Sequence, residues 1–206
     1  MVKCLILLGD SSFDNGAYVL AGQRDVAAHL REKLAPQEWT VELRAVDGSS
    51  SPNIKSQLER SPIQTPCCFV LSAGGNDALS NIEFLYDSDS YSFATVLERL
   101  YDIKEIFRSD YQQALDRILL LAQPLIVCTI YNPKFPEDNI RRAAEAALSV
   151  FNDVIVEEAL RQSLQIIDLR EVCKEEAHFA NPIEPSELGG ERIADAIMAA
   201  LKQAQS

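Results

Sequence analysis

Three short polar segments carry the residue types that acyl-transfer chemistry requires. They are Gly9-Asp10-Ser11, with Asp14 and Asn15 close behind, then Asp47-Gly48-Ser49, and then Gly74-Gly75-Asn76-Asp77. Acyl transfer needs a nucleophilic hydroxyl, which Ser11 offers, and N–H donors for the developing negative charge, which Gly48 and Asn76 offer. Any one segment has a simpler interpretation, because Asp and Ser cap helices and Gly permits turns. The three together favour an acyl-transfer site.

Each segment follows a stretch with the pattern of a buried strand. Five strands are predicted, at Lys3–Leu8, Trp39–Val46, Cys67–Leu71, Leu125–Ile130 and Leu164–Leu169. Helical spacing falls between and after them, at Ala17–Leu34, Ile54–Leu58, Phe93–Ala122, Glu137–Gln162 and Gly189–Ala204. Strands that alternate with helices form a parallel sheet covered on both faces, and ligands bind at the carboxyl ends of its strands. We therefore expect the three segments to converge at one edge of an α/β domain that spans residues 1–206.

The composition excludes several other classes of protein. The chain has 206 residues, 47% of them hydrophobic, and a formal net charge of −12. This profile is typical of a globular domain rather than of a fibrous or disordered chain. The chain is acidic, and its sequence has no cluster of basic residues that could bind a phosphate backbone, so no nucleic acid is expected as a partner. No apolar run approaches the roughly 20 residues that span a bilayer. A small molecule is the expected ligand, and the oligomeric state is left open.

The amino-terminal segment and the cysteines indicate a cytoplasmic, reducing location. Met1–Leu8 is apolar but short, and it lacks the small-residue cleavage site of a signal peptide. The five cysteines, an odd number, lack metal-ligand spacing, and most lie in apolar runs. We interpret them as structural thiols and expect no metal and no cofactor.

The three segments resemble conserved blocks of the SGNH, or GDSL, hydrolases, a family of serine esterases and lipases. The segment from Gly9 to Gly16 resembles block I, Gly48 falls at the glycine of block II, and Gly74-Gly75-Asn76-Asp77 matches the Gly-x-Asn-Asp of block III. Their order and spacing agree with the family over nearly the whole chain. The resemblance implies a three-layer α/β/α sandwich with a five-stranded parallel sheet in the flavodoxin-like order 2-1-3-4-5.

The resemblance also implies a mechanism. Ser11 would be the nucleophile, and its backbone N–H, the Gly48 N–H and the Asn76 side chain would form the oxyanion hole. The expected activity is that of a carboxylic-ester hydrolase that cleaves a small ester or acyl group through an acyl-enzyme on Ser11. Asp10, Asp14, Asn15 and Asp77 would be neighbours of the site.

The sequence departs from the family where the catalytic base is expected. The family has Asp-x-x-His before the last helix, whereas this chain has Asn181 at the Asp position and Glu184 at the His position, within Pro-Ile-Glu-Pro-Ser at residues 182–186. A carboxylate with a pKa of about 4.3 accepts a serine proton poorly in comparison with an imidazole near 6.5. Burial would raise the Glu184 pKa and narrow this gap. Glu184 can equally be a solvated carboxylate that favours a helix amino terminus.

His178 is the alternative base. Glu175 lies three residues before it, as an acidic residue does in the family block, but His178 precedes the Pro-Ser register by several residues. A surface or loop role is the competing interpretation of this histidine. A second class of function also stays open, namely a binding protein that keeps the cleft and its donors but lacks the usual His base.

Aromatic residues follow the third segment, at Phe84, Tyr86, Tyr91 and Phe93. Their spacing favours an ordinary packing cluster under a loop over a lip that contacts substrate.

Overall fold

A single all-parallel sheet organises the chain. The computed structural model describes residues 3–81 and 92–203. The sheet has the order β2-β1-β3-β4-β5, which confirms the predicted topology. The strands are β1 (Lys3–Gly9), β2 (Trp39–Leu43), β3 (Cys67–Ser72), β4 (Leu125–Cys128) and β5 (Gln165–Ile167). β2 lies on one side of β1, whereas β3, β4 and β5 follow on the other side, so the order in which strands are added reverses between β1 and β3. Ligands bind at such a point in folds of this kind.

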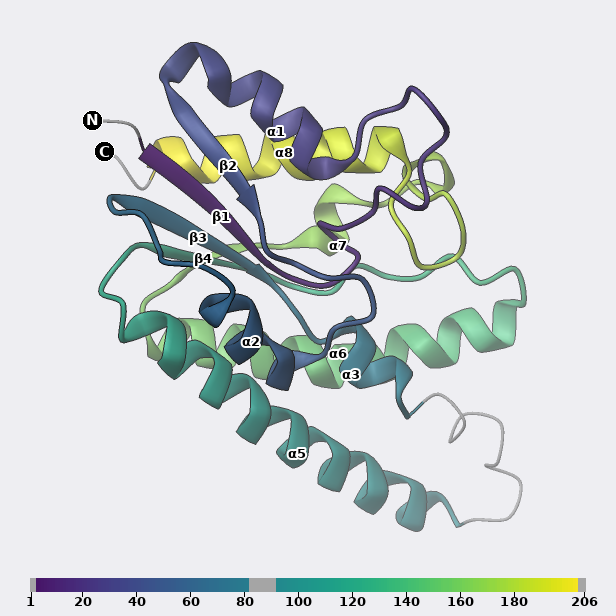
Figure 1. The fold of residues 1–206 in the computed structure, drawn as a ribbon. Helices are drawn as coiled ribbons and strands as arrows, with labels where there is room; N and C mark the ends of the chain where they lie inside the picture. The colour runs from purple at the N-terminus through teal and green to yellow at the C-terminus, as the bar shows by residue number, and fades with distance from the viewer. Residues whose placement is uncertain (1–2, 82–91, 204–206) are drawn as a thin grey trace.

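The helices cover both faces of the sheet and make the expected three layers (Figure 1). One face carries α1 (Val26–Leu34) and α8 (Glu187–Gln203). The other carries α2 (Ile54–Glu59), α3 (Gly75–Leu79), α5 (Phe93–Leu119) and α6 (Asp138–Arg161). The remaining short elements are α7 (Leu169–Val172) and three 3₁₀ turns at Ala35–Gln37, Ser51–Asn53 and Glu176–His178.

Alternate residues of β1 explain why the core has two halves. Leu5 and Leu7 pack with α1 and α8 on one side, whereas Ile6 and Leu8 pack with α5 and α6 on the other. Side chains of a strand point to opposite faces in turn, so a strand that is covered on both sides must be apolar throughout. The continuous apolar run of β1 thus follows from its central position in the sheet.

Several predicted boundaries were wrong. The strand expected to reach Ile130 ends at Cys128, and the one expected over Leu164–Leu169 spans Gln165–Ile167. Two others have a clear local cause. The helix expected from Ala17 begins only at Val26, because the side chain of Asp25 caps it by accepting a hydrogen bond from the Ala28 N–H at 2.6 Å. The strand expected to reach Val46 ends at Leu43. Beyond that point, the backbone N–H groups of both Arg44 and Ala45 donate to the Leu7 carbonyl, which breaks the regular ladder.

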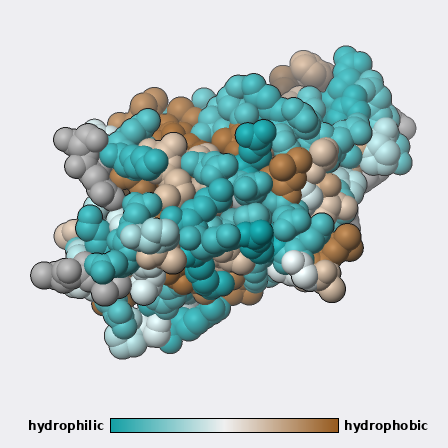
Figure 2. Space-filling model, turned by 90° about the horizontal axis from the view of Figure 1, so that it is seen from above, coloured by the Kyte–Doolittle hydropathy of each residue, from teal (hydrophilic) through white to brown (hydrophobic). Residues whose placement is uncertain are grey.

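The outer surface of the layer that holds α1 and α8 is mainly hydrophilic, with hydrophobic residues in small separate groups (Figure 2). In residues 3–81 and 92–203, none of the helices combines the length and the apolar character that crossing a bilayer requires. All five cysteines are free and buried. Burial raises the pKa of the Cys68 and Cys173 thiols to about 12.

Candidate active site

A glycine and a glutamine set the direction of the chain as it leaves β1. Gly9 has φ of 132°, and a Cβ at this position would lie 1.8 Å from the Ser72 carbonyl oxygen of β3. Gln57 of α2 bonds to Gly9 twice: its Oε1 accepts from the Gly9 N–H at 2.9 Å, and its Nε2 donates to the Gly9 carbonyl at 2.7 Å. The segment that carries Ser11 is therefore held on both sides as it turns away from the sheet.

Ser11 shares one cavity with two other residues that the sequence singled out. The cavity has a volume of about 480 Å³, and Ser11, Asn76 and Glu184 all line it. Asn76 belongs to α3, which follows β3, and Glu184 comes from the segment before α8. Three parts of the chain that are far apart in sequence thus meet at the carboxyl edge of the sheet.

Glu184 has an environment that makes its carboxylate more basic. The residue is only 5% exposed. Burial raises its pKa from 4.5 to about 7, a hydrogen bond with the Ser11 side chain opposes the rise, and the nearby charges of Asp47 and Asp10 add to it. Its Oε2 atom is buried and accepts no hydrogen bond from any residue that the structure describes. The carboxylate therefore shares the cavity with the Ser11 side chain, lies close enough to interact with it, and retains the capacity to take up a proton.

A tight turn positions Glu184. The Oδ1 atom of Asn181 accepts hydrogen bonds from the backbone N–H groups of Ile183 and Glu184, both at 3.0 Å. The Glu184 carbonyl accepts from the Ala180 N–H at 2.8 Å. The Tyr131 hydroxyl donates to the Ile183 carbonyl at 2.7 Å. Asn181 thus acts on the position of Glu184 through the backbone of the turn, and not through a side-chain hydrogen bond to it.

Asn15 ties the serine segment to the glutamate segment. It is fully buried, its Nδ2 donates to the Pro185 carbonyl at 3.1 Å, and its Oδ1 accepts from the Val26 N–H at 3.0 Å. These two bonds join the loop after β1, the start of α1 and the turn that bears Glu184.

The candidate oxyanion donors are the Ser11 N–H, the Gly48 N–H and the Asn76 amide. Neither backbone N–H donates a hydrogen bond within residues 3–81 and 92–203. The Asn76 Nδ2 donates to the Ser49 carbonyl at 3.0 Å, which orients the amide and uses one of its two hydrogens. Asp77 supports the same loop, because its carboxylate accepts from the backbone N–H and the hydroxyl of Ser51.

Several acidic groups surround the nucleophile. Burial raises the pKa of Asp10 from 3.8 to about 6, although hydrogen bonds from Ser12 oppose the rise. Asp14 Oδ2 accepts from the Asp47 N–H at 3.0 Å, and Asp47 Oδ2 accepts from the Tyr18 hydroxyl at 2.7 Å. That hydrogen bond is the main reason why the pKa of Tyr18 rises to about 12. These two hydrogen bonds join Asp14, Asp47 and Tyr18 into one group, which we call the polar bank. Asp47 and Tyr18 interact with Glu184, but none of the three lines the cavity.

His178 occupies a different environment from Glu184. It is buried in the 3₁₀ turn Glu176–His178, where its Nδ1 accepts from the Glu175 N–H at 3.3 Å. Its backbone carbonyl accepts from the Ser186 N–H at 3.0 Å and packs against Gly189. His178 is not among the described residues that line the cavity, and no described interaction joins it to Ser11.

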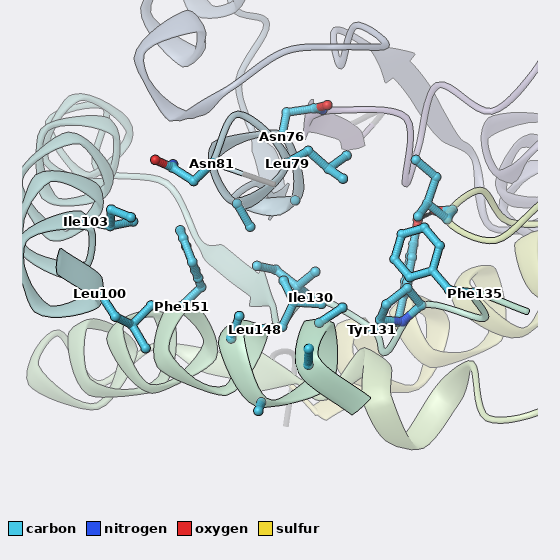
Figure 3. A pocket seen from close by; sticks show the side chains of 18 of the residues that line it. Asn76, Leu79, Asn81, Leu100, Ile103, Ile130, Tyr131, Phe135, Leu148 and Phe151 are labelled. Carbon is cyan, nitrogen blue, oxygen red and sulfur yellow. Dashed lines mark hydrogen bonds between the residues drawn. The ribbon is translucent and has the colours of Figure 1, made fainter. Parts of the chain in front are cut away.

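The apolar walls of the cavity were not predicted from the sequence. Figure 3 shows Leu100 and Ile103 of α5 at one end, Tyr131 and Phe135 at the other, and Leu148 and Phe151 of α6 between them. The helical spacing of apolar residues predicts only that these side chains pack in a core. It does not reveal that α5 and α6 lie far enough apart to leave a cavity between them. Phe93 also lines the cavity, whereas Phe84, Tyr86 and Tyr91 lie outside the described residues. In residues 3–81 and 92–203, no group of three His, Cys, Asp or Glu side chains could hold a metal ion.

Comparisons with known proteins identify the family and the fold of the chain. A family model described as the GDSL-like lipase/acylhydrolase family matches residues 7–191. No curated protein sequence matches the chain. Among solved structures, phospholipase A1 from Streptomyces albidoflavus NA297 is similar, with 14% identity and a TM-score of 0.71 over 97% of this chain and 99% of that one.

Two further structures share the fold. An extracellular lipase from Streptomyces rimosus has 16% identity and a TM-score of 0.71 over 97% of this chain and 100% of its own. The acetyl xylan esterase AlAXEase has 15% identity and a TM-score of 0.70, with coverage of 96% and 98%. At such low identity these similarities establish the fold alone.

Proposed function

The chain belongs to the GDSL-like lipase/acylhydrolase family, and on that basis we propose that it is a serine carboxylic-ester hydrolase with Ser11 as nucleophile and Glu184 as base. The observation that carries the proposal is the buried Glu184 carboxylate, which lines the same cavity as Ser11, interacts with its side chain and has a pKa raised to about 7. A base is most effective when its pKa lies near the working pH. Burial thus gives a carboxylate the basicity that imidazole supplies elsewhere.

The reaction follows from the positions of these groups. Glu184 takes the proton of the Ser11 hydroxyl as Oγ attacks the ester carbonyl, and the N–H donors of Ser11, Gly48 and Asn76 stabilise the oxyanion. Glu184 then gives its proton to the departing alcohol, which leaves an acyl group on Ser11. In the second half, Glu184 takes a proton from water as the water oxygen attacks the acyl carbon. The bond to Ser11 Oγ then breaks, Oγ takes this proton from Glu184, and the acid leaves the regenerated enzyme. Asn15, Asn181 and Tyr131 would act as positioning residues.

The alternatives predict different behaviour. If His178 is the base, Glu184 becomes dispensable for turnover. If the protein only binds its ligand, Ser11 does not form a covalent bond with any acyl or phosphonyl reagent.

Labelling with a fluorophosphonate probe tests the proposal directly. We expect labelling of the wild-type protein, complete loss in Ser11→Ala, and retention in Ser56→Ala, which changes an exposed serine of α2. The same three proteins should show the same order in hydrolysis of a 4-nitrophenyl ester. Equal labelling of the wild type and Ser11→Ala, in protein shown by circular dichroism to be folded, would exclude Ser11 as the nucleophile.

A further inference from the structure

The site has two sides of opposite character. The cavity runs from Ser11 between α5 and α6 and is mostly apolar, whereas the polar bank formed by Asp14, Tyr18 and Asp47 lies outside it. We propose that the cavity binds the acyl chain of an ester with about eight to twelve acyl carbons, and that alanines of α6 set the length it accepts. This inference rests on the proposed hydrolase function and names its substrate class.

The size and lining of the cavity carry the first step. Its volume is about 480 Å³. A methylene group is close in size to a water molecule, whose share of liquid volume is about 30 Å³, so a chain of about eight to twelve carbons takes up about 240 to 360 Å³, roughly half to three quarters of the cavity. An acetyl group would leave most of the apolar lining without a partner. The cavity therefore extends the expectation of a small ester to a medium-chain one.

The walls come from two facing helices. Val96, Leu100 and Ile103 of α5 recur at helical spacing and line one side. The α6 side combines large and small residues, namely Ala143, Ala144, Ala146, Ala147, Leu148 and Phe151. Figure 3 shows the labelled side chains of both helices around a common space.

The alanines of α6 account for the open space. Ala147 lies one helical turn before Phe151 and is half-buried at the lining. Because Ala147 lines the cavity, a larger side chain at this position would take up part of its volume. Ala147 is therefore a specificity-determining residue: its small size keeps this part of the cavity open.

The chemistry assigns the cavity to the acyl group instead of the alcohol. During the reaction the acyl group stays bonded to Ser11, while the alcohol must leave and water must enter. Asp47 and Gly48, on the polar side of Ser11, are exposed and give such an aqueous route. The apolar cavity is therefore suited to the acyl chain, and the polar bank to the departing alcohol and the incoming water.

A series of 4-nitrophenyl esters from acetate to tetradecanoate tests the chain length. We expect kcat/KM to rise up to about fourfold per added methylene, which corresponds to about 0.8 kcal/mol, until the cavity is filled. Ethyl octanoate should be a better substrate than its isomer octyl acetate. A rate that falls steadily from acetate onward, or a preference for octyl acetate, would overturn the inference.

Substitutions on α6 test its cause. In Ala147→Phe, the ratio of kcat/KM for octanoate to that for acetate should fall at least tenfold, whereas Ala199→Phe, an exposed change on α8, should keep the wild-type ratio. An unchanged ratio in folded Ala147→Phe contradicts the assignment, and if that variant does not fold, the wild-type series still decides. Hydrolysis of acetate that depends on Ser11 but shows no chain preference refutes only this inference, whereas hydrolysis that survives Ser11→Ala refutes the proposed function itself.

Discussion

Replacing Glu184 with glutamine should change both activity and stability with a common dependence on pH. Glutamine keeps the shape of the side chain and cannot accept a proton from Ser11. Because the wild-type carboxyl has a pKa of about 7, its base form should be half populated near that pH. The wild-type kcat/KM should then rise about tenfold per pH unit on the acid side and level off above the pKa.

The size of the loss follows from the role of a base. General-base catalysis contributes about 10²- to 10⁴-fold, so Glu184→Gln should lose this factor in alkaline buffer and show no acid limb. The midpoint of the acid limb does not by itself show whether Glu184 or His178 is the base, since burial brings the carboxyl pKa close to that of imidazole. His178→Ala makes the distinction, because it should retain the limb if Glu184 is the base.

Stability supplies a readout that is independent of turnover. In the unfolded chain the carboxyl ionises near its ordinary value of 4.5, whereas in the folded protein it ionises near 7. The folded protein therefore binds more protons than the unfolded chain between these values, so the contribution of Glu184 to stability is complete below about pH 4.5 and is lost as the pH rises through 7. The full change corresponds to about 3 kcal/mol, and screening by solvent at the cavity mouth lowers it to about 2 kcal/mol.

Urea unfolding of the wild type and Glu184→Gln across this range measures the effect. The free energy of unfolding of the variant, minus that of the wild type, should increase by about 2 kcal/mol between about pH 5 and about pH 8. The comparison removes the contribution of Asp10, which is present in both proteins. A difference that stays constant within about 0.5 kcal/mol, together with an intact acid limb, would refute the view that burial makes Glu184 the base.

Three further predictions concern the groups around it. Asn76→Ala should lower kcat by about 10²- to 10³-fold with little change in KM, because its amide acts on charge that develops in the transition state, and a loss below threefold in steady-state assays would contradict that role. Asn15→Ala should lower the free energy of unfolding by about 2 to 4 kcal/mol, since it leaves the Val26 N–H and the Pro185 carbonyl buried without partners. Chemical denaturation at fixed pH measures this loss, and a clearly smaller loss would contradict the role of Asn15. Asp47→Asn should lower the Glu184 pKa, so the acid limb of the pH–rate profile should move to lower pH, and an unmoved limb would show that the two charges do not interact.

The fold could be predicted because several independent patterns agreed. The apolar run of β1, its termination at Gly9 and the polar loops after the first three strands all indicate a parallel sheet with a site at its carboxyl edge. The position of Glu184 could also be predicted, because the residues around it align with the block that holds the family's base. Local signals failed where a cap was overlooked, as at Asp25, whose side chain delays the start of α1.

The remaining features depend on contacts that no single segment encodes. The pKa of Glu184 is set by burial together with Ser11, Asp47 and Asp10, which lie more than 130 residues before it. The cavity depends on the distance between α6 and α5. The sequence alone does not show whether an alanine of α6 packs closely against a neighbour or lines a cavity. These features belong to the assembled tertiary structure.

The hydrogen bond from Asn15 to the Pro185 carbonyl, which spans 170 positions of the chain, has a consequence for biosynthesis. A ribosome must translate as far as residue 185 before the turn with Glu184 can reach the serine loop, so a shorter nascent chain lacks the base that we propose. The same separation suits a two-fragment reporter. Cutting the gene between α5 and β4 would place Ser11 and Glu184 on different polypeptides, and ester cleavage would then signal that the two halves have met.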